Sequence, residues 1–141
     1  SRWRAAHPET HVISPDPARA DRYRKDPYSA YAGSELLRFP VAPLPPLTPE
    51  ITNKSLVVVV GPPGKRVVYP LKWLAKRVAP DGTLTLAQDG VQVVMRYGDK
   101  PPHVEVDVPA GAVGWDVVHA SWFAWFSTNP DDARLAEDLR P

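Results

Sequence analysis

The run Leu56-Val57-Val58-Val59-Val60, followed by Gly61-Pro62-Pro63-Gly64 and then by Arg66-Val67-Val68-Tyr69, decides the fold. An unbroken apolar run rich in β-branched side chains is typical of a buried strand. Two glycines and two prolines in four residues turn the chain, so the second apolar run pairs with the first as a β-hairpin. We therefore expect a sheet built around residues 56–60.

The chain beyond this hairpin continues with one short helix and three more strands. Pro70 suits the first position of a helix, and apolar residues at near-helical spacing predict that helix over residues 71–78. Alternating runs predict strands over 83–86, 91–97 and 103–108. Five strands with short connections predict a mostly β (α+β) fold, a small antiparallel five-stranded curled sheet or barrel with short helices.

Aromatic residues mark the C-terminal part. Trp122, Phe123, Trp125 and Phe126 stand at helical spacing and are expected in the core. The segment Asn129-Pro130-Asp131-Asp132 has the residue types that open a helix: a capping side chain, proline at the first position and acids in the first turn. We predict a terminal helix beginning there.

Proline divides the chain into two parts. There are 18 prolines in 141 residues, and nine lie in the first fifty. Proline fixes φ and removes a backbone donor, so residues 1–50 are expected to form an extended proline-rich arm with little regular structure. The arm also carries tyrosine, leucine and phenylalanine, which predicts that it packs on the β-rich body of residues 51–141 as one folding unit.

Composition excludes several classes of function. The net charge of +1 gives no electrostatic reason to expect a nucleic-acid partner. The chain has no cysteine, which excludes disulfides, thiolate metal sites and cysteine nucleophiles. The longest apolar run is far too short to span a membrane. The loop Gly61–Lys65 is unlike a phosphate-binding loop, because its prolines lack the required N–H donors.

Two segments at opposite ends of the chain share one pattern. Trp3-Arg4-Ala5-Ala6-His7-Pro8-Glu9 and Trp125-Phe126-Ser127-Thr128-Asn129-Pro130-Asp131 both read tryptophan, three residues, a polar residue, proline and an acid. A repeated pattern suggests a structural unit that is used twice.

A family resemblance emerges from fragments that stand in one order. They are Trp3…His7-Pro8-Glu9-Thr10, Ser14-Pro15-Asp16, Asp26-Pro27-Tyr28, Phe39-Pro40-Val41, Tyr69-Pro70-Leu71 and Trp122-Phe123-Ala124-Trp125…Asn129-Pro130-Asp131. In this order they resemble the bacterial domain-of-unknown-function family numbered 3179. The resemblance implies an exported protein, periplasmic or extracellular, and no established activity. Larger members carry a cysteine-containing segment that this chain lacks, so its role is not carried over.

We expect a non-enzymatic binding or structural module that contacts a protein partner through aromatic surface. Trp3 and Trp73 are the predicted partner-binding residues, because exposed tryptophans anchor interfaces. Self-association is left open, since an edge strand can pair with another chain. No residue is predicted to be catalytic.

Two alternatives stay open beside this prediction. One is a small-ligand site between the arm and the body, formed by His7, His11, Asp16 and Tyr28. In this alternative the two histidines, four residues apart, could also bind a metal ion, although Pro8 disfavours the helix that would put them on one face. The other alternative is a degenerate enzyme that has lost its chemistry together with the cysteine segment.

Overall fold

The computed structural model describes residues 2–24 and 26–136, without the side chains of Arg2, Trp3 and Ala32. The chain divides into two compact units, Ser1–Ser34 and Glu35–Pro141. Each unit is described by itself.

The regular structure of the first unit, over its described residues 2–24 and 26–34, consists of short helical turns. They are α1 (Arg2–Ala6), the 3-10 turn η1 (Pro17–Arg19), α2 (Ala20–Tyr23) and α3 (Ser29–Ala32). Each is too short to be stable through its own backbone hydrogen bonds. None of residues 4–24 and 26–31 is buried. That residues 1–50 form an extended arm packed on the body stays a prediction.

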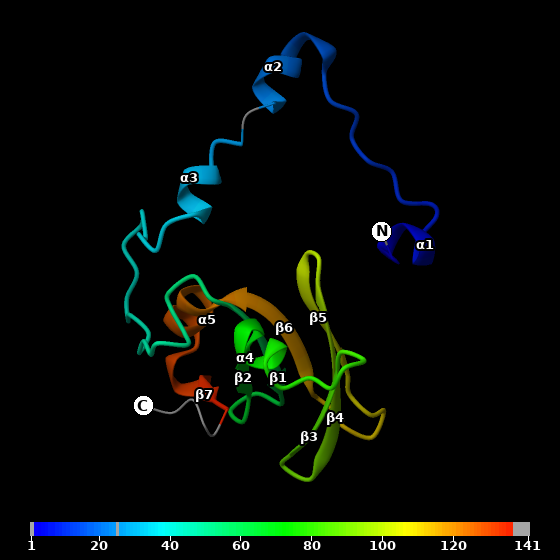
Figure 1. The fold of residues 1–141 in the computed structure, drawn as a ribbon, viewed down its shortest axis with the longest axis vertical. Coiled ribbons are helices and arrows are strands. Elements are labelled where there is room, and N and C mark those ends of the chain that lie inside the picture. Colours follow the sequence, from blue (N-terminus) through cyan, green and yellow to red (C-terminus); the bar gives the residue numbers. More distant parts are fainter. Residues whose placement is uncertain (1, 25, 137–141) are drawn as a thin grey trace. The chain divides into compact units, whose positions relative to one another are not determined.

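The second unit holds the strands and the core (Figure 1). Its elements in chain order are β1 (Leu56–Gly61), β2 (Val67–Pro70), α4 (Leu71–Ala75), β3 (Thr83–Gln88), β4 (Val91–Asp99), β5 (Pro102–Asp107), β6 (Asp116–Ser121), α5 (Trp122–Thr128), η2 (Pro130–Asp132) and β7 (Arg134–Leu135). The segment from Glu35 to Ser55, most of which was assigned to the arm, belongs to this unit.

The strands form two sheets. One has the order β6-β1-β2-β7 and the other β3-β4-β5, with every pair antiparallel except β2 and β7. The prediction of a mostly β, mostly antiparallel fold with short helices is confirmed. The prediction of one five-stranded sheet or barrel is wrong. The predicted hairpin and the three predicted strands that follow it belong to separate sheets. Strands β6 and β7, which sequence patterns missed, complete the first sheet.

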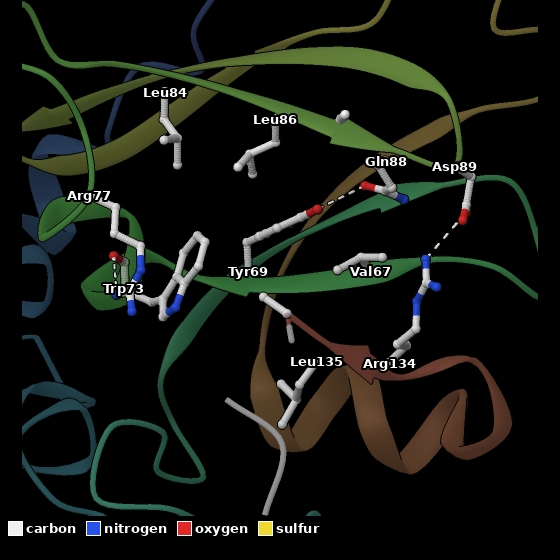
Figure 2. Close-up of a pocket in the computed structure, with 12 residues that line it drawn as sticks. Val67, Tyr69, Trp73, Arg77, Leu84, Leu86, Gln88, Asp89, Arg134 and Leu135 are labelled. Carbon is white, nitrogen blue, oxygen red and sulfur yellow. Dashed lines mark hydrogen bonds and ion pairs between the residues drawn. The ribbon is translucent and has the colours of Figure 1, made fainter. Parts of the chain in front are cut away.

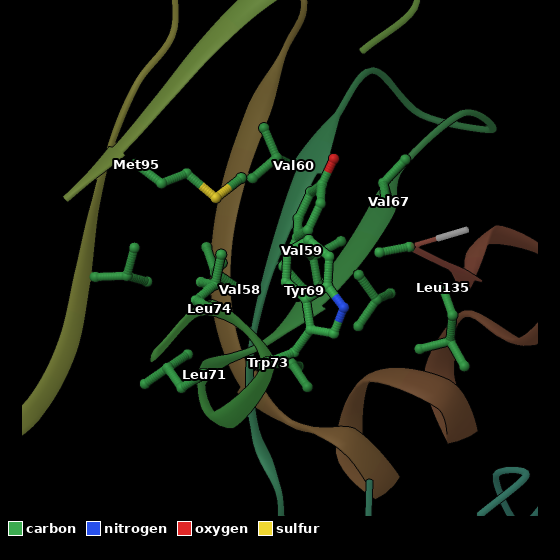
Figure 3. Close-up of a cluster of buried hydrophobic side chains, with 14 of the residues drawn as sticks. Val58, Val59, Val60, Val67, Tyr69, Leu71, Trp73, Leu74, Met95 and Leu135 are labelled. Atoms are coloured by element: carbon green, nitrogen blue, oxygen red, sulfur yellow. The ribbon is translucent and has the colours of Figure 1, made fainter. Parts of the chain in front are cut away.

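Strand β1 is at the centre of the fold. Val57, Val58, Val59 and Val60 are at most 1% exposed, although successive side chains of a strand point to opposite faces. Val58 is paired with Tyr69 of β2, and this face of β1 is turned towards the second sheet. Figure 3 shows Met95 reaching from β4 towards Val60, and Leu74 of α4 beside Val58.

The opposite face of β1 is covered by α5 and the chain that leads into β1. Trp122 is fully buried, and its backbone N–H donates to the Ser55 carbonyl at 2.9 Å. Its indole Nε1 donates to the Pro46 carbonyl at 2.9 Å, which fixes residues near 46 to the helix. The prediction that the C-terminal aromatic residues form a helix start in the core is confirmed for Trp122 and Trp125.

Two helix predictions need correction. The helix after Pro70 ends at Ala75, three residues before the predicted end. The predicted terminal helix is a single 3-10 turn, η2, after which the chain enters strand β7. Asn129 does not cap this turn with its side chain. Its Nδ2 instead donates back to the Trp125 carbonyl at 3.3 Å, at the end of α5.

The two similar segments adopt the same local structure. In each, a short helix ends immediately before the polar residue, at Ala6 in α1 and at Thr128 in α5. A turn follows in each, closed by a backbone hydrogen bond of 3.1 Å, from Thr10 N to His7 O and from Asp132 N to Asn129 O. The shared pattern therefore specifies a helix followed by a turn.

The η2 turn is fastened to the β1–β2 hairpin by the carboxylate of Asp132. This carboxylate accepts from Gly64 N at 2.9 Å, from Arg66 N at 3.0 Å and from the Arg66 guanidinium at 2.8 Å. Burial acts to raise the pKa of Asp132, but the hydrogen bonds from Gly64 and Arg66 outweigh it and hold the pKa below its ordinary value. The carboxylate therefore stabilises the fold in its ionised form.

Replacing Asp132 by asparagine is expected to lower the free energy of unfolding by about 2 kcal/mol, because it weakens several charge-assisted hydrogen bonds at once. Urea unfolding at pH 7 measures this, with Asp131→Asn at the exposed neighbour as the matched control. The difference between wild type and Asp132→Asn should be full at neutral pH. It should shrink as the pH falls below about 4, where the unfolded chain takes up a proton, and disappear below the folded-state pKa. Equal stability of Asp132→Asn and Asp131→Asn would contradict this role.

Candidate functional site

A pocket of about 620 Å³ lies where an edge of each sheet meets helix α4 (Figure 2). Its apolar walls are Val67, Tyr69, Trp73, Leu84, Leu86 and Leu135, and its polar side chains are Arg77, Gln88, Asp89 and Arg134. All lie in the second unit.

Strand alternation explains one wall of the pocket. Leu84, Leu86 and Gln88 are every second residue of β3, so their side chains share one face. Figure 2 shows Leu84 and Leu86 pointing from β3 towards Tyr69 and Trp73. Leu84 and Leu86 are only half-buried, so their side chains stay accessible from the pocket.

The opposite wall comes from the end of β2 and from α4. Tyr69 is the next-to-last residue of β2, and Pro70 directs the chain into α4, where Trp73 lies. The two rings pack with centroids 5.8 Å apart and planes tilted by 46°. Trp73 is 6% exposed. The small accessible part of this tryptophan therefore belongs to a pocket wall.

Two buried polar groups satisfy each other at the floor of the pocket. The Tyr69 hydroxyl donates to Gln88 Oε1 at 3.0 Å, and Gln88 Nε2 donates to the Val60 carbonyl at 2.9 Å. These bonds link the two sheets. Gly61, with φ of 134°, leaves room for this amide, because a Cβ there would lie 2.8 Å from Gln88 Nε2. Burial raises the pKa of Tyr69 to about 12, so the phenol stays a neutral donor.

An arginine lies at each end of the pocket. The Arg77 guanidinium lies 4.3 Å from the centre of the Trp73 ring, a cation–π geometry. At the other end, Arg134 of β7 pairs with Asp89 of the β3–β4 turn at 3.2 Å. With aromatic and aliphatic walls between these ends, the arrangement can bind an apolar group that carries negative charge.

Of the residues predicted from sequence, Trp73 belongs to this pocket. Trp73 is nearly buried and presents only part of its side chain to the pocket, and its partner-binding role stays a prediction. The side chain of Trp3 lies outside the described residues. Sequence reasoning did not identify Tyr69, Leu84, Leu86 or Gln88 as site residues, although the alternation predicted over 83–86 puts Leu84 and Leu86 on one face.

The other predicted site residues lie in the first unit. His7 Nδ1 is 3.6 Å from Glu9, and Asp16 accepts from Ala18 N at 3.0 Å, where it caps η1. His11 and Tyr28 are exposed. Among the described residues no three histidine, aspartate or glutamate side chains come together in a group that could hold a metal ion. A ligand-binding role for these four residues stays a prediction.

The Tyr69–Gln88 link should be visible in a titration and in stability. In the folded protein one of the five tyrosines is expected to ionise only at about pH 12, and Tyr69→Phe should remove this step from an absorbance titration at 295 nm. Because the pKa of Tyr69 is raised on folding, the stability that it contributes is full below pH 10 and is lost as the pH rises towards 12. Tyr69→Phe should cost about 1–3 kcal/mol at pH 7, since Gln88 Oε1 loses its donor. Tyr28→Phe, at an exposed tyrosine, is the control, and an unchanged titration in Tyr69→Phe would refute the assignment.

Comparison with known proteins identifies the family of the chain. Within the residues that the structure describes, no helix has the length and apolar character needed to cross a membrane. No curated protein and no solved structure matches the chain. The sequence model of one family, described as "protein of unknown function (DUF3179)", matches residues 1–110. The chain therefore belongs to the DUF3179 family, as its ordered sequence fragments predicted.

Proposed function

We propose that the chain is a non-enzymatic binding module that holds an apolar group of a protein partner in the pocket between β3, β2 and α4. The observation that carries the proposal is the pocket wall itself, where Leu84 and Leu86 stay half-exposed opposite Tyr69 and Trp73. A concave pocket with apolar walls and a few polar side chains is the usual form of a binding site. Contact with a protein partner through aromatic and aliphatic surface fits this wall.

The size of the pocket supports the proposal. Its volume of about 620 Å³ is in the range of known ligand pockets, roughly 300–1,000 Å³. Burying one leucine-sized or phenylalanine-sized side chain there would contribute about 1.5–3 kcal/mol. Several such groups are therefore needed for tight binding, which favours a chain segment over a single small group.

Charge at the pocket ends favours an acidic partner. Among the described lining residues are two arginines, Arg77 and Arg134, and Arg134 pairs with Asp89. A guanidinium also has five donors in a fixed plane, and it matches a carboxylate geometrically. As part of the same proposal, the module works outside the bacterial cytoplasm, which rests on the family resemblance alone.

The pocket can be tested with 8-anilinonaphthalene-1-sulfonate, which joins an apolar ring system to one negative charge. We expect the folded protein to bind this dye with an increase in fluorescence, and Leu86→Trp to weaken binding at least about fivefold by filling the pocket. Gln92→Trp, on the exposed side of β4, is the matched control. Near-ultraviolet circular dichroism confirms that each variant is folded, since loosened proteins also bind the dye. Equal binding by Leu86→Trp and wild type would refute the pocket as the site.

The charge preference has its own test. Arg77→Gln is expected to weaken dye binding about threefold or more, because the guanidinium near Trp73 is removed. Lys72→Gln removes the same charge from an exposed position of α4 that does not line the pocket. Fluorescence titration at low and high salt compares the two variants. A loss of equal size in both would show that only the net charge matters.

A further inference from the structure

The edge of the second sheet beside the pocket lacks the usual protection against pairing with another strand. Natural edge strands carry charges or proline, or are very short. In the part of the chain that the structure describes, β5 contains Pro102, Glu105 and Asp107, β6 contains Asp116, and β7 has two residues, one of them an arginine. Strand β3, Thr83–Gln88, contains no charged residue and no proline.

Hydrogen bonds at the start of β3 establish which backbone groups face outwards. Thr83 N donates to Asp81 Oδ1 at 2.9 Å, and Thr83 O accepts from Ala79 N at 2.8 Å, so both groups point away from β4. The preceding residue, Gly82, accepts from Tyr97 N on the β4 side. In an antiparallel pair, the backbone N–H and C=O groups of successive residues point alternately towards the partner strand and away from it. The N–H and C=O groups of Thr85 and Ala87 therefore point away from β4, like those of Thr83.

The two ends of this edge differ. The outward groups of Thr83 are satisfied locally by Asp81 and Ala79. Within the described residues, no backbone hydrogen bond from another segment reaches Thr85 or Ala87. Both residues are exposed, and Ala87 also lines the pocket. An open row of strand donors and acceptors therefore lies directly beside an apolar pocket.

We infer that an extended segment of the partner protein adds to the free edge of β3 as a further strand, and that its alternate apolar side chains enter the pocket. The inference rests on the proposed function, for which it names the form of the bound chain. Strand addition gives affinity through backbone hydrogen bonds and specificity through pockets for every second side chain. Side chains on the pocket face would lie beside Leu84 and Leu86.

Charge further specifies the segment. The edge residues Thr85 and Ala87 are uncharged, so the residues that pair with them need no charge complement. The guanidinium of Arg77 at one pocket end favours an acidic side chain at that end of the bound segment. The ligand class is thus a short β-forming peptide segment, alternately apolar, with an acidic end.

The test uses a random nonapeptide phage library selected against the full chain, followed by fluorescence anisotropy with the selected peptide made synthetically. Two N-methylated versions carry methyl groups on one or the other alternating set of amides. Strand addition predicts that one set weakens binding at least about tenfold, while the other changes it less than about twofold. It also predicts that Thr85→Pro, which removes an outward N–H at an edge position where proline is tolerated, weakens binding at least about threefold.

The outcomes separate the two proposals. Suppose that Leu86→Trp abolishes binding of the selected peptide, but that both N-methylated versions bind as tightly as the unmodified peptide. This result would overturn strand addition and leave the pocket as the site. Binding unaffected by Leu86→Trp would overturn the proposed function.

Failure of the library to yield any peptide, with the dye still bound, would overturn strand addition. Dimerisation of the wild type that is abolished by Thr85→Pro would overturn it too, because the edge would then serve a second copy. The N-methylated peptides decide the question even if Thr85→Pro fails to fold.

Discussion

The rest of the structure depends on the burial of both faces of β1. Four consecutive valines cannot all reach one layer, because a strand turns successive side chains to opposite sides. Val58 and Val60 face the second sheet, and Val57 and Val59 face the layer that contains Trp122. This requirement places β2 and β6 on the two edges of β1 and covers both of its faces. A small α+β domain with two separate sheets is the result.

The same arrangement creates the candidate site. Two sheets that pack over a short central strand leave open sides, and one of these lies between β3 and the end of β2. The Tyr69–Gln88 and Gln88–Val60 hydrogen bonds fix the distance between the sheets there. The Asp132–Arg66 contact holds η2 against the β1–β2 hairpin, immediately before β7, which supplies Leu135 to the pocket wall. Stability and the site thus depend on overlapping contacts.

The sequence predicted the local elements better than their assembly. The valine run and the alternating runs of β4 and β5 each contain their own sequence signal. Strand β6 has only a weak apolar pattern in the sequence. It forms a strand by antiparallel pairing with the edge of β1 that β2 does not occupy. Asn129-Pro130 has the residue types of a helix start, yet Asp132 binds the hairpin and the chain continues into β7. Trp73 was identified from sequence, but its pocket partners lie on other strands, and no local pattern shows which strands come together.

Hydrogen exchange along β3, measured for each amide by nuclear magnetic resonance, tests the central claim most directly. That claim is that an open strand edge borders the pocket. The account predicts alternation, with slow exchange at Leu84, Leu86 and Gln88, which bond to β4, and fast exchange at Thr85 and Ala87. Uniform protection from Leu84 to Gln88 in the free protein would contradict it, because the edge would then already be covered.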